Sequence, residues 1–102
     1  MTRYGWVEYA TATDAAATAT RAAQAGRQHV VKAVTASFDQ AAVALLTLRD
    51  GATVVWQGYV HNQAAVEFPS GVAATRGNAV SAELAAGGAG VTGAVALHGE
   101  TF

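Results

Sequence analysis

The chain has 102 residues, no cysteine and a net charge of −1, with six basic against seven acidic side chains. This length fits one compact domain and leaves little room for a second. The absence of cysteine excludes disulfides, thiolate catalysis and Cys-ligated zinc. Because the sequence has no basic run, we expect no nucleic-acid partner. It has no apolar run of about 18 residues, so we expect no membrane span, and its N-terminus lacks the apolar core of a signal peptide.

Alanine and glycine dominate the composition, with 26 and 11 copies. Both bury little area, so the apolar fraction of 52% overstates the core that the chain can form. Charged residues make up only 13%, and a surface with few charges suits packing against protein because few ions need desolvation. We expect a thin core that partner surface completes, although high-GC coding would give the same composition.

The first 14 residues contain three large aromatic side chains, Tyr4, Trp6 and Tyr9. A terminal segment is usually disordered unless it is tied down, so these aromatics indicate docking. Residues 1–14 are predicted to form either an extended N-terminal arm on a neighbouring subunit or the first strand of the protein's own sheet. Residues 15–102 are predicted to form a single domain.

Two strands are predicted next. Residues 15–25 mix alanine with Thr18 and Thr20, and no large apolar residue recurs at helical spacing, so a strand is favoured over a short helix. Residues 28–38 alternate as a strand, in which Lys32 interrupts one face and indicates a sheet edge. The two predicted faces of this strand are Val30, Val34, Ala36 and Phe38, and His29, Val31, Thr35 and Ser37.

Residues 43–60 are predicted to form a hairpin at the centre of the sheet core. Two apolar runs flank Asp50-Gly51, and a tight hairpin turn needs the positive φ that glycine adopts without a steric clash. The hairpin carries the largest apolar side chains in the middle of the chain. These are Leu45, Leu46, Leu48, Val54, Val55, Trp56 and Tyr59.

The rest of the chain alternates in short segments over residues 64–68, 78–84 and 91–97. Pro69-Ser70-Gly71 is predicted to end the first of them. The chain therefore has about seven or eight short strands at regular intervals, which predicts an all-β antiparallel sandwich, either jelly-roll or immunoglobulin-like.

No constellation of catalytic or metal-binding residues emerges. His29, His61 and His98 lack ligand spacing and are interpreted as solvated residues near strand ends. The carboxylates lie mostly at turns or on outward faces, no serine has a GxSxG setting, and the segment 87–90 lacks the lysine of a phosphate loop. We predict that the protein is not an enzyme and holds no metal or cofactor.

Aromatic side chains leave two interpretations open. Trp56 and Tyr59, with Tyr4 and Trp6, could form a sugar-binding platform, but core or interface packing is the stronger interpretation. The predicted partner interface consists of Tyr4, Trp6, Tyr9, Trp56 and Tyr59.

The order of segments over residues 28–102 resembles small β-sandwich virion proteins of tailed bacteriophages. The stretches that carry the resemblance are AVALLTLRDGATVVWQ, VEFP and GNAVSAELAAGGAGVTGAVALHG. The resemblance implies a capsid decoration, or cement, protein on the outer capsid surface of the virion, made in the host cytoplasm. It also implies a homotrimer bound to the major capsid protein across capsomer junctions. The alternative is a tail or fibre module that binds a host-surface glycan or another tail protein.

Overall fold

The structure is a computed structural model that describes residues 4–102, with Tyr4 described through its backbone alone. The chain forms eight strands and no helix within these residues. The strands are β1 (Tyr4–Thr13), β2 (Ala17–Arg21), β3 (His29–Phe38), β4 (Val43–Asp50), β5 (Thr53–His61), β6 (Gln63–Ala73), β7 (Val80–Leu84) and β8 (Thr92–Thr101).

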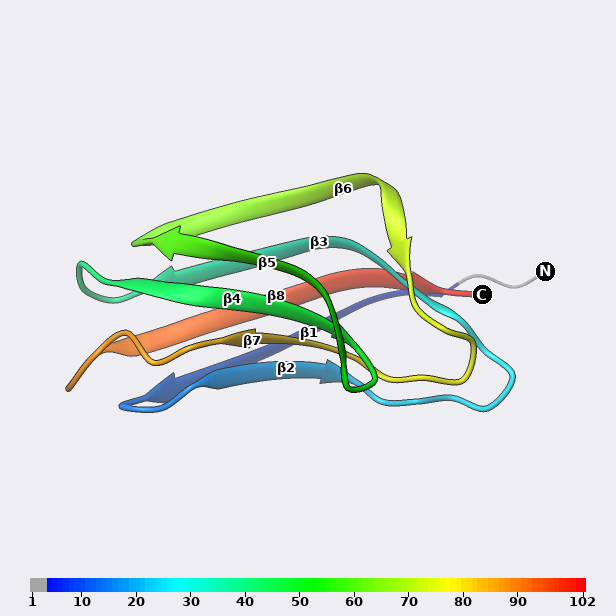
Figure 1. Cartoon of the computed structure of the whole chain (residues 1–102), viewed down its shortest axis with the longest axis horizontal. Coiled ribbons are helices and arrows are strands. Elements are labelled where there is room, and N and C mark those ends of the chain that lie inside the picture. The colour runs from blue at the N-terminus through cyan, green and yellow to red at the C-terminus, as the bar shows by residue number, and fades with distance from the viewer. Residues whose placement is uncertain (1–3) are drawn as a thin grey trace.

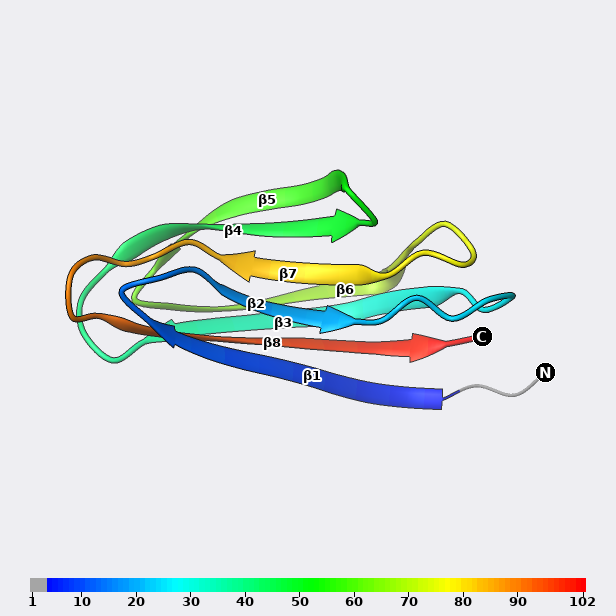
Figure 2. The same cartoon turned by 90° about the horizontal axis from the view of Figure 1, so that it is seen from below.

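The eight strands form two four-stranded antiparallel sheets (Figures 1 and 2). Sheet A has the order β1-β8-β3-β6 and sheet B the order β2-β7-β4-β5. The chain crosses between the sheets after β1, β2, β3, β5, β6 and β7, which gives the interleaved order of a jelly roll. The predicted antiparallel sandwich is confirmed, and the strand order selects the jelly roll over the immunoglobulin-like arrangement.

The N-terminal segment belongs to the sandwich. β1 pairs with β8 along ten residues, from Tyr4 opposite Thr101 to Thr13 opposite Thr92. Of the two alternatives for residues 1–14, the structure places residues 4–13 in a first strand, and residues 1–3 lie outside the described part.

The predicted faces of β3 are only half correct. His29 and Val31 are buried, and beyond Lys32 the inward positions become Val34 and Ala36. The pairing register of β3 shifts between Val31 and Ala33. A β-bulge adds one residue, so the side chains after it switch between the inward and outward faces. A prediction that assumes strict alternation along the whole strand misses this switch.

The same irregularity bends β6, so Pro69-Ser70-Gly71 is a corner within the strand and does not end it. Val31 pairs with Val72, whereas Ala33 pairs with Glu67, so residues 68–71 all lie opposite one residue of β3. Figure 1 shows β6 turning sharply there. Gly71 has a φ of 75°, and a Cβ on it would lie 2.5 Å from Val30 Cγ1, so this corner requires glycine.

The predicted hairpin is present, but only one of its strands is central to the core. Leu46 and Leu48 of β4 are 1% exposed. β5 is an edge strand of sheet B, and its Val54, Val55 and Tyr59 are exposed. The hairpin is therefore not the centre of the core as a whole, because an edge strand leaves its outer side chains in solvent.

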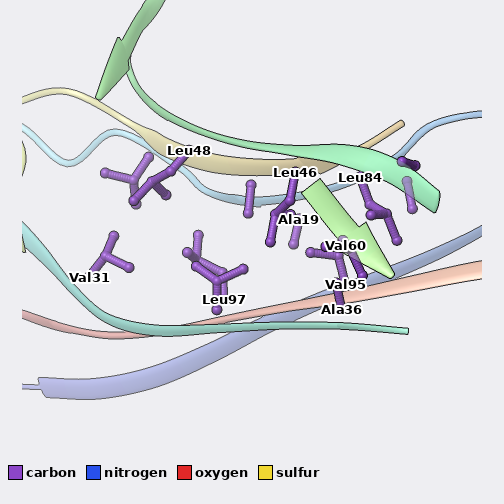
Figure 3. Packing of buried hydrophobic residues seen from close by; sticks show 14 of the residues in the cluster. Ala19, Val31, Ala36, Leu46, Leu48, Val60, Leu84, Val95 and Leu97 are labelled. Atoms are coloured by element: carbon purple, nitrogen blue, oxygen red, sulfur yellow. The ribbon is translucent and has the colours of Figure 1, made fainter. Parts of the chain in front are cut away.

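The core is a single layer of mostly small side chains between the two sheets (Figure 3). Its largest fully buried aliphatic residues are leucines, and each contributes about 1.5–3 kcal/mol when fully buried. Those leucines are Leu46, Leu48, Leu84 and Leu97. Alanines fill much of the remaining layer, namely Ala17, Ala19, Ala36, Ala44, Ala74 and Ala82.

A buried chain of hydrogen bonds joins three strands of sheet A near the end of the sandwich where the chain starts. Trp6 Nε1 donates to Thr101 Oγ1 at 2.8 Å, and Thr101 Oγ1 lies 2.7 Å from His29 Nδ1. His29 Nε2 lies 2.8 Å from the Ala22 carbonyl oxygen. A carbonyl only accepts, so Nε2 carries the proton and Nδ1 accepts from Thr101. His29 is 0% exposed, which corrects its interpretation as a solvated residue.

Replacing Thr101 by Val should destabilise the protein by about 2–3 kcal/mol, because it leaves two buried groups, Trp6 Nε1 and His29 Nδ1, without their partner. Urea denaturation would measure the loss. Thr92→Val is the matched control on the same strand, since the Thr92 hydroxyl bonds to Thr13 in an exposed pair, and it should cost less than about 0.5 kcal/mol. An equal loss of stability in the two variants would contradict the role given to the buried chain of hydrogen bonds.

Asp50 fixes the connection between β6 and β7 to the tip of the hairpin. Its Oδ2 accepts from the backbone N and the Oγ1 of Thr75, both at 2.9 Å, and its Oδ1 accepts from Asn78 Nδ2 at 2.9 Å. Partial burial raises the pKa of the Asp50 carboxyl, but the hydrogen bonds from Asn78 and Thr75 lower it by more, so the net pKa lies below its usual 3.8.

The lowered pKa of Asp50 predicts a loss of stability in acid. Its contribution is complete above the unfolded pKa of 3.8 and is lost as the pH falls through the lower folded value. Asp50→Asn should therefore be less stable than wild type near neutral pH, with the difference shrinking below about pH 4. Thermal unfolding across pH would test this, with Glu67→Gln on exposed β6 as control. A difference that does not change with pH would contradict it.

Candidate functional site

A trough lies on the outer face of sheet A. Its volume is about 490 Å³, and it crosses all four strands of the sheet. This volume falls in the range of small-molecule and ligand sites. We call it the sheet A trough. Its lining residues belong to β1 (Tyr9, Ala10, Thr11), β3 (Thr35, Ala36, Ser37), β6 (Gln63, Ala64, Ala65) and β8 (Ala94, Val95, Ala96).

The pairing between the strands of sheet A places the side chains of the trough in two rows on the outer face of the sheet. Side chains opposite one another in adjacent strands lie side by side on the same face. Within the trough the outward residues of β8 are Ala94 and Ala96, so the floor is low, whereas a tyrosine on β1 and a glutamine on β6 stand at the ends. One row is Tyr9, Ala96, Thr35 and Ala65, and the other is Thr11, Ala94, Ser37 and Gln63.

Most residues that line the trough are alanine or valine, with a few polar side chains among them. Thr11, Thr35 and Ser37 supply hydroxyl groups, and Gln63 supplies an amide. Tyr9 is 80% exposed and presents its ring at one end. Aromatic rings combined with a few hydrogen-bonding groups fix the orientation of polar ligands that also have an apolar face. The lining contains no Asp, Glu, Lys, Arg or His, so the trough suits a neutral ligand.

The five aromatics of the predicted interface do not converge. The Tyr4 side chain lies outside the described part. Trp6 is 9% exposed and packs against His29 with ring centroids 5.8 Å apart, so it is a core residue of its own chain and offers little surface to a partner. Tyr9 lies at the trough on sheet A, whereas Trp56 and Tyr59 belong to β5 of sheet B.

Trp56 and Tyr59 do not form a shared platform. Trp56 faces inward toward the gap between the sheets, where its ring meets that of Phe68 edge-on with centroids 5.8 Å apart. Tyr59 is 72% exposed and pairs with Leu45. Alternating strand positions put the two aromatics on opposite faces of β5, so they do not present their rings to one ligand, and Trp56 packs as the favoured interpretation expected.

A second surface lies on the hairpin. Four of its large apolar side chains are exposed by 44–72%. We call them the hairpin apolar strip. Its members are Val43, Val54, Val55 and Tyr59.

Residues 4–102 show no cluster of three or more His, Asp or Glu side chains that could hold a metal ion. The same residues include no helix that is long and apolar enough to span a membrane.

The sequence did not single out the residues of the trough other than Tyr9. Thr35, Ser37, Ala94 and Ala96 were ordinary outward positions of two predicted strands. The feature that marks the trough is a set of short side chains next to Tyr9 on the same face of sheet A. This arrangement can be recognised only when β8 is known to lie between β1 and β3.

No family model matches the sequence, and no curated protein matches it. Among solved structures, the chain is similar to the CBM36-1 domain of a multidomain xylanase from the hindgut metagenome of Trinervitermes trinervoides. The TM-score is 0.48 at 12% sequence identity, over 92% of this chain and 75% of that one. At this identity the likeness concerns the fold alone.

Proposed function

We propose that this protein is a non-enzymatic binding module that holds a neutral glycan in the sheet A trough. The observation that carries the proposal is Tyr9, which is 80% exposed at one end of a hollow without charged side chains, along which three hydroxyl groups and an amide are arrayed. An aromatic ring with so much exposed area contributes little to the core. Its place beside hydrogen-bonding groups suits a ligand with both apolar faces and hydroxyls.

A sugar ring meets both requirements. Its C–H face can stack on Tyr9, while hydroxyls of sugars farther along the trough can exchange hydrogen bonds with Thr35, Ser37 and Gln63. The trough crosses the strands from β1 to β6, so a chain of several sugars can run along it. A stack and a few net hydrogen bonds of about 0.5–1.5 kcal/mol each correspond to weak binding, with a dissociation constant from about 1 mM to 10 µM.

Binding to a glycan array would test the proposal. Tyr9→Ala should reduce retention at least about tenfold, because it removes the stacking surface. Ala96→Phe should also abolish binding, because it fills the floor of the trough with a ring. Both positions face outward, so thermal unfolding of the two variants should stay close to that of wild type.

Tyr59→Ala is the matched control, since it removes an exposed tyrosine of the same kind from the other sheet. It should leave glycan binding unchanged. A wild-type protein that no neutral glycan retains, or a Tyr9→Ala variant that binds as well as wild type, would overturn the proposal.

A second candidate function is capsid decoration, and the hairpin apolar strip is the observation that favours it. Val54, Val55 and Tyr59 expose apolar area in a strand without charged residues, and such area suits burial against protein. In this role, trimers bind the major capsid protein on the outer surface of a phage head. Many copies with modest interfaces then act together.

Mixing the purified protein with empty capsids would separate the two candidates. Decoration predicts saturation at a fixed ratio of this protein to capsid protein, and Tyr59→Lys should prevent it by placing a charge in the interface. Tyr9→Ala should then bind capsids normally. A protein that leaves capsids undecorated and is retained on glycans would exclude the decoration candidate.

A further inference from the structure

The two sheets have four edge strands, β1 and β6 in sheet A and β2 and β5 in sheet B. An edge strand carries unpaired backbone N–H and C=O groups, which can pair with another strand. Proteins usually block this with charges, proline, bulges or short strands. The four edges of this protein differ in how they are protected.

Three edges carry such protection. β6 contains Glu67, Pro69 and the corner at residues 68–71. β2 is only five residues long and ends in Arg21. β1 carries Glu8, which pairs with Arg21 at 2.9 Å and so links the two edges on that side of the sandwich.

β5 differs from the other three. Its nine residues, Thr53–His61, include no lysine, arginine, aspartate, glutamate or proline. A register shift against β4 places one bulge near Val55, and the residues from Trp56 onward pair regularly. Tyr59 is 72% exposed and Val55 44%, so apolar side chains accompany the free backbone edge. Figure 2 shows β5 along one side of the molecule, with β4 as its neighbour within the sheet.

We propose that β5 pairs with β5 of a second copy of this chain, antiparallel and about a two-fold axis near Gln57. The argument for this occupant is the complementarity of the strand with itself. In a two-fold contact the same surface meets itself, so a charge near the axis would lie close to its own copy, and a charge elsewhere along the strand would lose hydration. β5 has none, so pairing opposes no like charges and desolvates no ion. The register about Gln57 places Tyr59 beside Val55 of the second copy, and this contact occurs twice.

The pair would join two B sheets into one continuous sheet of eight strands. Backbone hydrogen bonds would satisfy the free edge, and the two Tyr59–Val55 contacts would cover part of the hairpin apolar strip. The contact uses the free edge of sheet B, whereas the trough lies on the outer face of sheet A, with Tyr9 on β1 at the end away from β6. The inference therefore stands or fails independently of the proposed glycan site.

Sedimentation velocity of the full 102-residue chain would test the pairing. We expect a mass twice the 10.3 kDa of one chain at high protein concentration, with dissociation on dilution. Tyr59→Lys and Val55→Lys should each sediment as monomers, because the lysine would lie against Val55 or Tyr59 of the second copy and lose its hydration. Tyr9→Lys is the matched control on β1, and it should still dimerise.

Hydrogen exchange gives a second readout that reports on the edge itself. Backbone amides of residues 56–61 that point away from β4 should exchange more slowly as wild-type concentration rises, and this protection should disappear in Tyr59→Lys. Circular dichroism would establish that each variant is folded, as expected for exposed positions. A monomer at all concentrations, a trimer, or a dimer that persists in both β5 lysine variants would overturn the proposal. A dimer whose β5 amides gain no protection would do the same.

Discussion

The position of β8 between β1 and β3 is the constraint on which the rest of the structure depends. Its inward residues Val95 and Leu97 enter the core, while its outward residues Ala94 and Ala96 form the floor of the trough. The hydrogen bonds of Thr101 to Trp6 and His29 hold the end of the strand in register with both neighbours. A shift of one residue would exchange the two faces, so the core and the trough depend on the same pairing.

Close approach between strands adds to this constraint. Gly99 allows the Trp6 ring to lie against the backbone of β8, because a Cβ there would come within 2.5 Å of the ring and 2.6 Å of the Val30 carbonyl oxygen. Trp6 can therefore reach the Thr101 hydroxyl. A residue that looked like a terminal anchor for a neighbouring molecule instead closes one end of its own sandwich.

Much of the fold could be predicted from local sequence, since alternation and the Asp50-Gly51 signal gave the hairpin and most of the strands. The predictions of strand faces and strand ends failed where the pairing between strands departs from simple alternation of inward and outward side chains. The bulge near Lys32 changed the phase of β3, and the corner at Gly71 continued β6 where Pro69 indicated an end. The trough could not be predicted, because Thr35 and Ala96 are far apart in sequence and meet only through strand order. Tyr9 was identified as an interface residue from its residue type, but the residues around it in the trough were not identified.

The alternation along β8 has a consequence for how such a protein can diversify. Replacing Ala94 or Ala96 changes the depth and chemistry of the trough but removes nothing from the layer between the sheets, whereas Val95 and Leu97 have no such freedom. The shape of the trough and the folding of the chain are thus encoded by interleaved but separate positions of one strand. The trough can change through point substitutions while the scaffold stays the same.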